Sequence, residues 1–216
     1  MSSDGGTPIV LPVGHYLGAF HPAVDQPPSH HLVRMGWEPV RLGDDAELDV
    51  WGFAHGLPAE LGRGPWTRAS LLEAAAGAGH ADVTDVLDHL LDVGVVVEVV
   101  VGGAQAREFA EHHRIQPLLI GLGPAPGEAL DAIGVPGLTV ALHAAPRVFE
   151  VWQWAHLWPD LWSACEGLAE ANRDLGQVDP ATTDPAEVLT FVLGAVQTLV
   201  AHGAAYLDHR PRPAPR

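Results

Sequence analysis

The chain contains 216 residues, 47% of them apolar, and its 27 acidic and 11 basic residues give a formal net charge of −16. The apolar content is sufficient for a packed core and argues against a disordered protein, whereas the negative charge disfavours non-specific binding of nucleic acid. No apolar run approaches the ~20 residues that cross a bilayer, the N-terminus lacks the regions of a signal peptide, and the single cysteine, Cys165, cannot build a disulfide framework. We therefore expect a cytoplasmic protein that does not contact a membrane.

An internal repeat organises the sequence. The segment VWGFAHGLP at residues 50–58 returns as VWQWAHLWP at residues 151–159. The flanks agree: residues 39–42 align with 139–142, residues 9–13 align loosely with 117–121, and residues 82–96 resemble 184–207. A repeat of this length predicts two tandem copies of one supersecondary unit.

The first copy is assigned to residues 9–101. Two short runs at 31–35 and 38–42 flank Gly36-Trp37 and indicate a β-hairpin. Three helices with start and stop signals follow. The first is opened by Asp44-Asp45, runs through Ala54 and is stopped by Gly56 and Pro58; the others are 68–76, capped by Thr67, and 83–93, capped by Asp82 and closed by Gly94. The β-branched run at 95–101 predicts a final strand, for which the sequence shows no evident partner.

The second copy is assigned to residues 117–208, after a bridging segment at 102–116 with a helix at 108–115. Its hairpin is expected at 132–135 and 138–142, and its helices at 148–157, 161–172 and 187–202. The tails, 1–8 and 209–216, are expected to be disordered.

A strand pair, three short helices and a terminal strand are typical of a winged helix, a variant of the helix-turn-helix. The predicted fold class is therefore α+β, with tandem winged-helix-like modules that each contain a small β-hairpin or sheet and three helices.

Residues 39–97 also resemble the PqqD-like fold. The hairpin, a first helix near Trp51, a second helix capped by Thr67 and a leucine-rich last helix that ends at Gly94 carry this resemblance. It implies a peptide recognition element, which binds the leader peptide of a ribosomally made peptide as an added strand beside the sheet and the last helix. The resemblance extends more weakly over 139–208, where the last helix is longer and Trp154, Trp158 and Trp162 replace the usual turn.

The third helix of the first copy argues against DNA binding in the winged-helix geometry. That geometry places basic and amide side chains of this helix in the major groove, but here the helix carries Asp85, Asp88 and Asp92. The alternative function, a transcriptional regulator, would contact DNA through arginines elsewhere: Arg63, Arg68, Arg107 and Arg114.

Protein or peptide recognition is the preferred interpretation. Tryptophan is favoured at interface hot spots, and a strand edge can accept a peptide strand. The expected contact residues are Asp85, Asp88, Asp92, Val97, Val99, Trp154, Trp158 and Trp162. A third interpretation is a small-molecule sensor whose pocket is lined by the tryptophans. A homodimer is compatible with each of these functions.

No catalytic, metal or cofactor site is expected. The 13 histidines show none of the H-x-x-x-H, C-x-x-C or H-E-x-x-H spacings, and His55 and His156 occupy matching repeat positions, which favours a shared structural role such as a hydrogen bond at a helix end. The glycine-rich segment at 121–127 contains two prolines where a dinucleotide loop needs backbone N–H groups. Cys165 lies among apolar helix positions and is expected to be buried. The sequence thus predicts a non-catalytic protein that binds a peptide or protein, in peptide maturation or in a regulatory complex.

Overall fold

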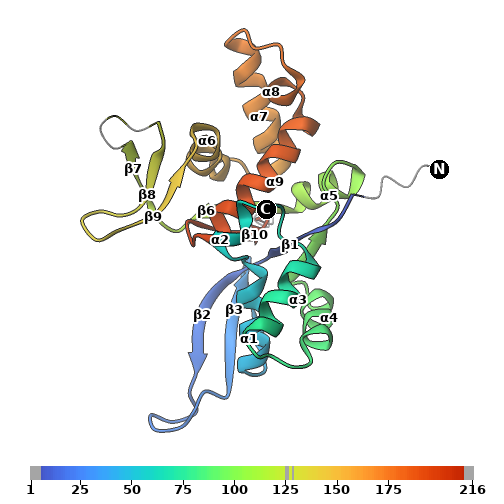
Figure 1. The fold of residues 1–216 in the computed structure, drawn as a ribbon, viewed down its shortest axis with the longest axis vertical. Helices are drawn as coiled ribbons and strands as arrows, with labels where there is room; N and C mark the ends of the chain where they lie inside the picture. The colour runs from blue at the N-terminus through green and yellow to red at the C-terminus, as the bar shows by residue number, and fades with distance from the viewer. Residues whose placement is uncertain (1–5, 125–126, 128, 212–216) are drawn as a thin grey trace, which may run out of the picture.

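The computed structural model describes residues 6–124, 127 and 129–211 and shows a mixed α+β protein whose two halves repeat one order of elements (Figure 1). Each half begins with a strand and continues with a three-stranded antiparallel sheet and a group of helices. Each half then ends with a strand that pairs antiparallel with the first. The helix α5 (Ala104–His112) connects the halves.

In the first half the paired strands are β1 (Ile9–Pro12) and β5 (Val96–Val99), and the sheet contains β2 (His15–Phe20), β3 (His30–Met35) and β4 (Glu38–Leu42). The helices are α1 (Asp45–Ala54), α2 (Pro58–Leu61), α3 (Arg68–Gly77) and α4 (Val83–Asp92). In the second half the paired strands are β6 (His113–Pro117) and β10 (Ala205–His209), and the sheet contains β7 (Ile120–Pro124), β8 (Asp131–Val135) and β9 (Thr139–Ala144). The helices are α6 (Pro146–Trp154), the 3-10 helix η1 (Ala155–Leu157), α7 (Leu161–Asp174), α8 (Pro180–Thr183) and α9 (Pro185–Ala201).

The strand β1 is buried on both faces, as its uninterrupted apolar sequence requires. Val10 belongs to the core that α1, α3 and α4 build in the first half. Ile9 and Leu11, on the opposite face, belong to a larger core made mainly by the second half. The β1–β5 ribbon therefore separates two cores and contributes to both.

The helix α9 is the central element of the second half. It is apolar on most of its circumference, and a helix of this kind is stable only when it is surrounded. It contacts α6, α7, α8 and β10, and it also reaches α5 and, in the first half, α2. Figure 1 shows α9 running from the end of the molecule that holds α7 and α8 towards β10 and the first half.

Two buried polar side chains join the halves. The Gln197 amide on α9 accepts a bond from the Trp66 N–H (3.2 Å) and donates to the carbonyl oxygens of Val10 (3.1 Å) and Trp66 (2.9 Å). The Asp208 carboxylate on β10 accepts from the Gly36 N–H (2.6 Å) and from Arg34 (3.1 Å) in the hairpin of the first half. These bonds fix the register between elements that are far apart in the sequence.

The capping signals locate two helices correctly and fail at a third. The Asp44 carboxylate accepts from the Glu47 N–H (3.0 Å), and the Thr67 hydroxyl accepts from the Ser70 N–H (3.3 Å). The predicted cap at Asp82 is wrong, because this residue has a φ of 55° and its side chain makes no capping bond. An N-cap residue needs an extended backbone to aim its oxygen at the first turn.

In the bridging segment 102–116, the helix predicted at 108–115 begins and ends earlier, at Ala104 and His112. The helix α5 ends at His112, and the next five residues form β6. His113 and Ile115 are buried alternately with more exposed neighbours, as in a half-buried strand. The second half therefore begins at 113, not at 117, and β6 rather than 117–121 occupies the position that β1 has in the first half.

Both sheets contain a strand that the sequence did not indicate. The predicted hairpins correspond to β3–β4 and β8–β9, and β2 and β7 add a third strand to each. The strand expected at 95–101 is shorter and is paired with β1. In the expected tails, residues 1–5 and 212–216 lie outside the described residues, and His209 belongs to β10. No helix within the described part of the chain is long and apolar enough to cross a membrane.

Candidate functional site

The first three-stranded sheet presents β2 as an edge strand. The sheet order is β2-β3-β4, and no further strand pairs with β2 among the described residues. Tyr16 and Ala19 lie between the β2 residues that bond to β3, so their backbone N–H and C=O groups point away from the sheet. The opposite edge is less able to pair with another strand, because Pro39 on β4 has no backbone N–H to donate. Of the two edges, β2 is therefore the one that can accept another strand.

A hollow of about 420 Å³ lies between β2 and α1 and is lined by Tyr16, Leu48, Asp49, Trp51, Gly52, Phe53, Leu57 and His80. Its walls are mainly apolar and aromatic. The Tyr16 and Trp51 rings lie 6.4 Å apart, and the Phe53 and His80 rings meet edge to face at 5.5 Å. A Cβ added at Gly52 would meet no atom within 4 Å, so this side of the hollow is open. An apolar side chain of a ligand can enter here.

A buried histidine holds the Tyr16 wall in place. His31 lies on β3 and is 5% exposed. Its Nε2 lies 2.8 Å from an Asp45 carboxylate oxygen, and its Nδ1 lies 3.0 Å from the Tyr16 hydroxyl. A carboxylate can only accept, so in the neutral ring Nε2 carries the proton and Nδ1 accepts from the hydroxyl. Both polar ends of the imidazole are thus satisfied, and the phenol ring is positioned at the entrance of the hollow.

One carboxylate, from Asp49, lines the hollow, and further acidic side chains lie nearby on the first turn of α1. The Asp45 side chain is 81% exposed beyond its bond to His31. Asp49 is half exposed and lies 3.8 Å from His80. Asp44 and Glu47 belong to the same turn of α1, where carboxylates are favoured by the helix dipole. A ligand with positive charge is therefore favoured at this face.

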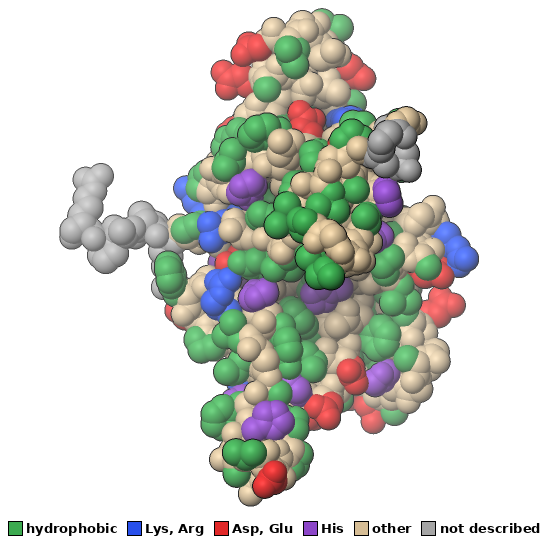
Figure 2. Space-filling model, turned by 90° about the vertical axis from the view of Figure 1, so that its left-hand side faces the viewer, with side chains coloured by type: hydrophobic (Ala, Val, Ile, Leu, Met, Phe, Trp, Pro, Cys, Tyr) green, Lys and Arg blue, Asp and Glu red, His purple; other side chains and the backbone are tan. Residues whose placement is uncertain are grey.

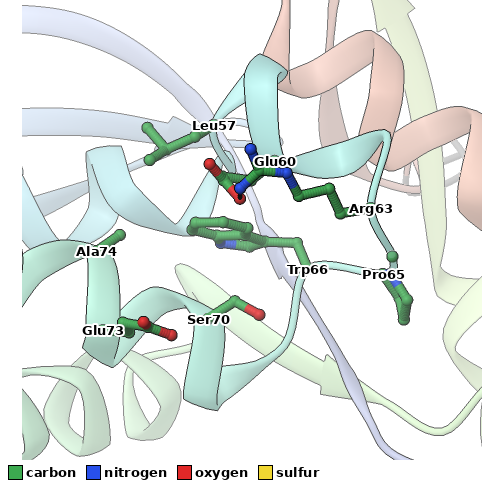
Figure 3. Close-up of a pocket in the computed structure, with 9 residues that line it drawn as sticks. Leu57, Glu60, Arg63, Pro65, Trp66, Ser70, Glu73 and Ala74 are labelled. Atoms are coloured by element: carbon green, nitrogen blue, oxygen red, sulfur yellow. Dashed lines mark hydrogen bonds and ion pairs between the residues drawn. The ribbon is translucent and has the colours of Figure 1, made fainter.

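A second hollow, of about 410 Å³, adjoins the first and shares Leu57 with it. It lies between α2 and α3 and is lined in part by Trp66, which is almost completely buried (3% exposed) (Figure 3). The indole N–H donates to the Phe53 carbonyl (2.9 Å), which fixes the ring. Glu60 and Arg63 stand on one side of the ring, and Ser70 and Glu73 on the other. We call the two adjoining hollows together the α1 groove; they share Leu57, with Tyr16 in the lining of one and Trp66 in that of the other.

The corresponding position in the second half is filled. By the sequence repeat, α6 matches α1, and Trp152 matches Trp51. A Cβ added at Gly121 on β7 would lie 3.0 Å from the Trp152 ring and 3.1 Å from the Phe149 ring. These two rings pack directly on β7, where the first half leaves a hollow between β2 and α1.

The second sheet instead exposes apolar side chains on its outer side. Ile120, Leu122, Leu138 and Val140 are all exposed. Figure 2 shows hydrophobic side chains gathered at the centre of the face on which this sheet lies.

The expected acidic contacts on α4 have different surroundings. Asp85 and Asp92 are exposed on this helix. Asp88 forms an ion pair with Arg68, which also lies 3.7 Å from Glu98. An expected peptide contact and an expected DNA contact are thus bonded to each other.

The β5 residues expected to contact a peptide face the interior. Val99 is buried, and Val97 packs against the core shared with the second half. Their side chains contribute to packing and do not line the α1 groove.

The three tryptophans of the second half do not form one surface. Trp158 packs on Gly167, where an added Cβ would lie 2.4 Å from its ring. The Trp162 ring lies under the Arg107 guanidinium at 4.3 Å and bonds to Glu166 (2.8 Å). Trp154 is 45% exposed, and it is the one of the three that offers a large free surface.

The four arginines of the alternative DNA-binding function are each engaged by a carboxylate. Arg63 bonds to Glu60 at 2.7 Å, and Arg107 bonds to Glu111 at 2.8 Å. Arg114 lies 3.9 Å from the buried Asp208, and Arg68 pairs with Asp88. These arginines belong to separate elements, so they form no continuous basic face.

The matching histidines have different environments. The His55 ring bonds to the Trp51 carbonyl (3.0 Å), and burial lowers the pKa of His55. The Nδ1 atom of His156 is buried and has no hydrogen-bond partner among the described residues. The expected shared hydrogen bond at a helix end is therefore found at His55 alone.

Cys165 is buried as expected, and burial raises the pKa of its thiol to about 12. Within the described residues, no group of three or more histidine, cysteine, aspartate or glutamate side chains is placed to hold a metal ion.

Sequence reasoning did not find the residues of the α1 groove. Trp51, Phe53 and Leu57 belong to the repeat segment 50–58 and Leu48 to the predicted first helix, but none of them was assigned to a site, and Tyr16 was in no predicted element. Residues 15–20 (HYLGAF) are a short segment interrupted by Gly18 and lack the apolar–polar alternation that indicates a strand. No protein-family model, curated protein or solved structure matches the chain.

Proposed function

We propose that this protein is a non-catalytic peptide-binding protein, and that the first half receives an extended peptide in the α1 groove beside the free edge of β2. The observation that carries the proposal is the open hollow between β2 and α1, with its aromatic walls, the Asp49 carboxylate in its lining and the acidic first turn of α1. The PqqD-like resemblance of residues 39–97 points to the same class of function. In this proposal the peptide lies beside α1, whereas the PqqD-like resemblance implies a peptide beside the last helix.

Backbone geometry supports an added strand. The outward N–H and C=O groups of Tyr16 and Ala19 supply main-chain bonds, which are independent of the peptide sequence. Alternate side chains of an added strand point to one face, so every second residue of the peptide can enter the hollow. The preferred peptide has apolar residues at those positions.

Charge supports a basic peptide. The first half carries six carboxylates between residues 44 and 73, against Arg63 and Arg68, and both arginines are already engaged. Exposed carboxylates on the rim raise the rate of association of a cationic partner more than its affinity. Binding is therefore expected to weaken at high salt.

The first half is assigned as the binding half because the matching space in the second half is occupied. Trp152 and Phe149 pack where a peptide side chain would enter. The second half is then the support, since its core holds Ile9 and Leu11 of β1 in place.

The test is selection from a random peptide display library with the full chain, followed by affinity measurement on the selected sequences. We expect basic peptides with alternating apolar residues, and we expect Leu57→Asp to weaken their binding at least tenfold, because a charge would be placed between the two hollows. Leu157→Asp is the matched control, because Leu157 is an exposed leucine after the matching helix. It should leave the affinity unchanged.

Main-chain pairing is tested separately by hydrogen exchange. A bound peptide should slow exchange at the Tyr16 and Ala19 amides. Selected peptides that bind equally well to both leucine variants, or that leave these amides unprotected, would contradict the proposal.

A further inference from the structure

The hollow around Trp66 lies next to the apolar part of the α1 groove but has a different chemistry. Its lining includes two carboxylates, from Glu60 and Glu73, together with Ser70 and the almost fully buried Trp66. Its volume of about 410 Å³ is more than a single side chain occupies. A hollow of this composition is suited to a ligand that is both cationic and partly apolar.

The two carboxylates are not equivalent. Glu60 is bonded to Arg63 at 2.7 Å. Glu73 is exposed on α3 and has no ion pair or hydrogen bond to any described residue. One negative charge of the hollow is thus unpaired, and the other is paired with an arginine that is itself 76% exposed.

Arg63 shows which chemical group fits this position. Figure 3 places its guanidinium beside Glu60, on the face of the hollow opposite Ser70 and Glu73. A guanidinium is flat and bonds to carboxylates in a forked geometry. The chain's own cation therefore stands at the mouth of a hollow that a cation from a ligand can enter.

We propose that the hollow around Trp66 is a binding site for a guanidinium or alkylammonium group, which Glu73 and Glu60 hold from the two sides of the hollow that they line and for which Arg63 competes. The ligand's cation displaces Arg63 from Glu60 and takes up Glu73 as its second partner. Where the cation belongs to a bound peptide, this site rests on the proposed function. Because the two hollows share Leu57, an arginine or lysine of the bound peptide can reach the site while its neighbours fill the apolar hollow. A free polyamine or arginine carries the same chemistry.

The proposal predicts opposite effects for two substitutions at one site. Glu73→Gln should weaken binding of a cation about tenfold, because it removes a charge-assisted bond. Arg63→Ala should tighten binding about threefold, because it removes the competing cation. Two controls change the charge elsewhere: Glu170→Gln, on the exposed side of α7, and Arg41→Ala, on β4. Both should leave the affinity within experimental error.

The probes separate the two sources of the cation. Arginine amide and spermidine test free ligands, and the Trp66 indole N–H resonance, assigned with Trp66→Phe, reports occupancy of the hollow. A selected groove peptide, with each basic residue replaced in turn by norleucine, tests the peptide source. Shifts of the Trp66 resonance with arginine amide, reduced by Glu73→Gln, support the site even where the peptide library yields no ligand.

The proposal is overturned by two results. One is that neither the free cations nor the basic residues of the peptide affect the Trp66 resonance. The other is that Glu73→Gln and Glu170→Gln change affinity equally, which would assign the effect to net charge. Peptide binding that depends on Leu57 but not on Glu73 would leave the proposed function intact and refute this site alone.

Discussion

His113 is a histidine that the fold holds in its neutral form. Its ring stacks on Phe109 with 4.2 Å between ring centroids and meets the His209 ring at 5.2 Å. Its Nδ1–H donates to the Phe109 carbonyl (2.8 Å). Burial, and secondarily the neighbouring His209, lowers the pKa of His113 to about 4. The cationic form is thus disfavoured by its apolar surroundings.

Because of this lowered pKa, the free energy of unfolding decreases as the pH falls. The unfolded histidine has a pKa of about 6.5, so below this value the unfolded state binds a proton that the folded state excludes. The contribution of His113 is fully present above about pH 6.5 and is lost as the pH falls towards 4. The free energy of unfolding therefore falls by roughly 2 kcal/mol between pH 8 and pH 5 through His113. His55, whose pKa is also lowered by burial, acts in the same direction.

We expect His113→Gln to reduce the difference in unfolding free energy between pH 8 and pH 5 by about 2 kcal/mol. Urea denaturation at the two pH values measures this difference. His112→Gln, at the exposed neighbouring residue, should keep the full pH dependence. An unchanged dependence in His113→Gln would mean that other groups control the acid sensitivity.

At the scale of the element, two glycines inside helices of the second half should respond to alanine in opposite ways. Gly194 on α9 is exposed, and an added Cβ would meet no atom within 4 Å. Gly167 on α7 lies under Trp158, and an added Cβ would be 2.4 Å from its ring. Intrinsic helix propensity favours alanine at both positions, so packing decides the difference.

Gly194→Ala is expected to raise the free energy of unfolding by about 0.5–1 kcal/mol, because alanine loses less backbone entropy in a helix. Gly167→Ala is expected to lower it by about 1–3 kcal/mol, because the Trp158 ring must move out of its packing position. Chemical denaturation with tryptophan fluorescence measures both. A gain in stability from both substitutions would show that Trp158 adapts without cost.

The elements that the sequence predicts well are those with local signals. The helices α1 and α3 begin at residues whose side chains cap them, and α4 and α9 are followed by Gly94 and Gly203 with φ values of 77° and 61°. These features depend on residues within one turn. A sequence read by its periodicity and caps therefore places most of the helices.

The elements that were missed depend on distant partners. The strand β6 reads as a continuation of α5, and its pairing with β10 joins residues that lie at opposite ends of the second half. β2 and β7 contain glycines and a bulge each, which weaken the alternation on which a strand prediction rests. The α1 groove was missed for the same reason, because it forms where β2 meets a helix that follows two strands later.

At the scale of the whole molecule, the halves share one framework. The larger core contains Ile9, Leu11 and Val99 from the first half together with α7 and α9 of the second. Gly14, between β1 and β2, donates its N–H to the Leu207 carbonyl on β10 (2.8 Å). Two units joined in this way are expected to unfold together.

Gln197 is the residue on which this coupling is best tested. Its side chain satisfies the Trp66 N–H and two carbonyl groups inside the interface. Gln197→Leu keeps the apolar volume but leaves the buried Trp66 N–H without a partner, which costs about 2–3 kcal/mol. The exposed Gln153 on α6 gives the control, Gln153→Leu, which should change stability by less than about 0.5 kcal/mol.

Cys165 supplies an independent measure of unfolding in the second half. Its thiol is buried, and its pKa is raised to about 12, so a thiol reagent should modify it only after unfolding. Tryptophan fluorescence reports both halves. In the wild type, we expect Cys165 modification and the fluorescence change to share one denaturation midpoint, and in Gln197→Leu we expect both to move to lower urea together. Early loss of the fluorescence signal with Cys165 still protected would mean that the first half unfolds alone and that Gln197 couples it only weakly to α9.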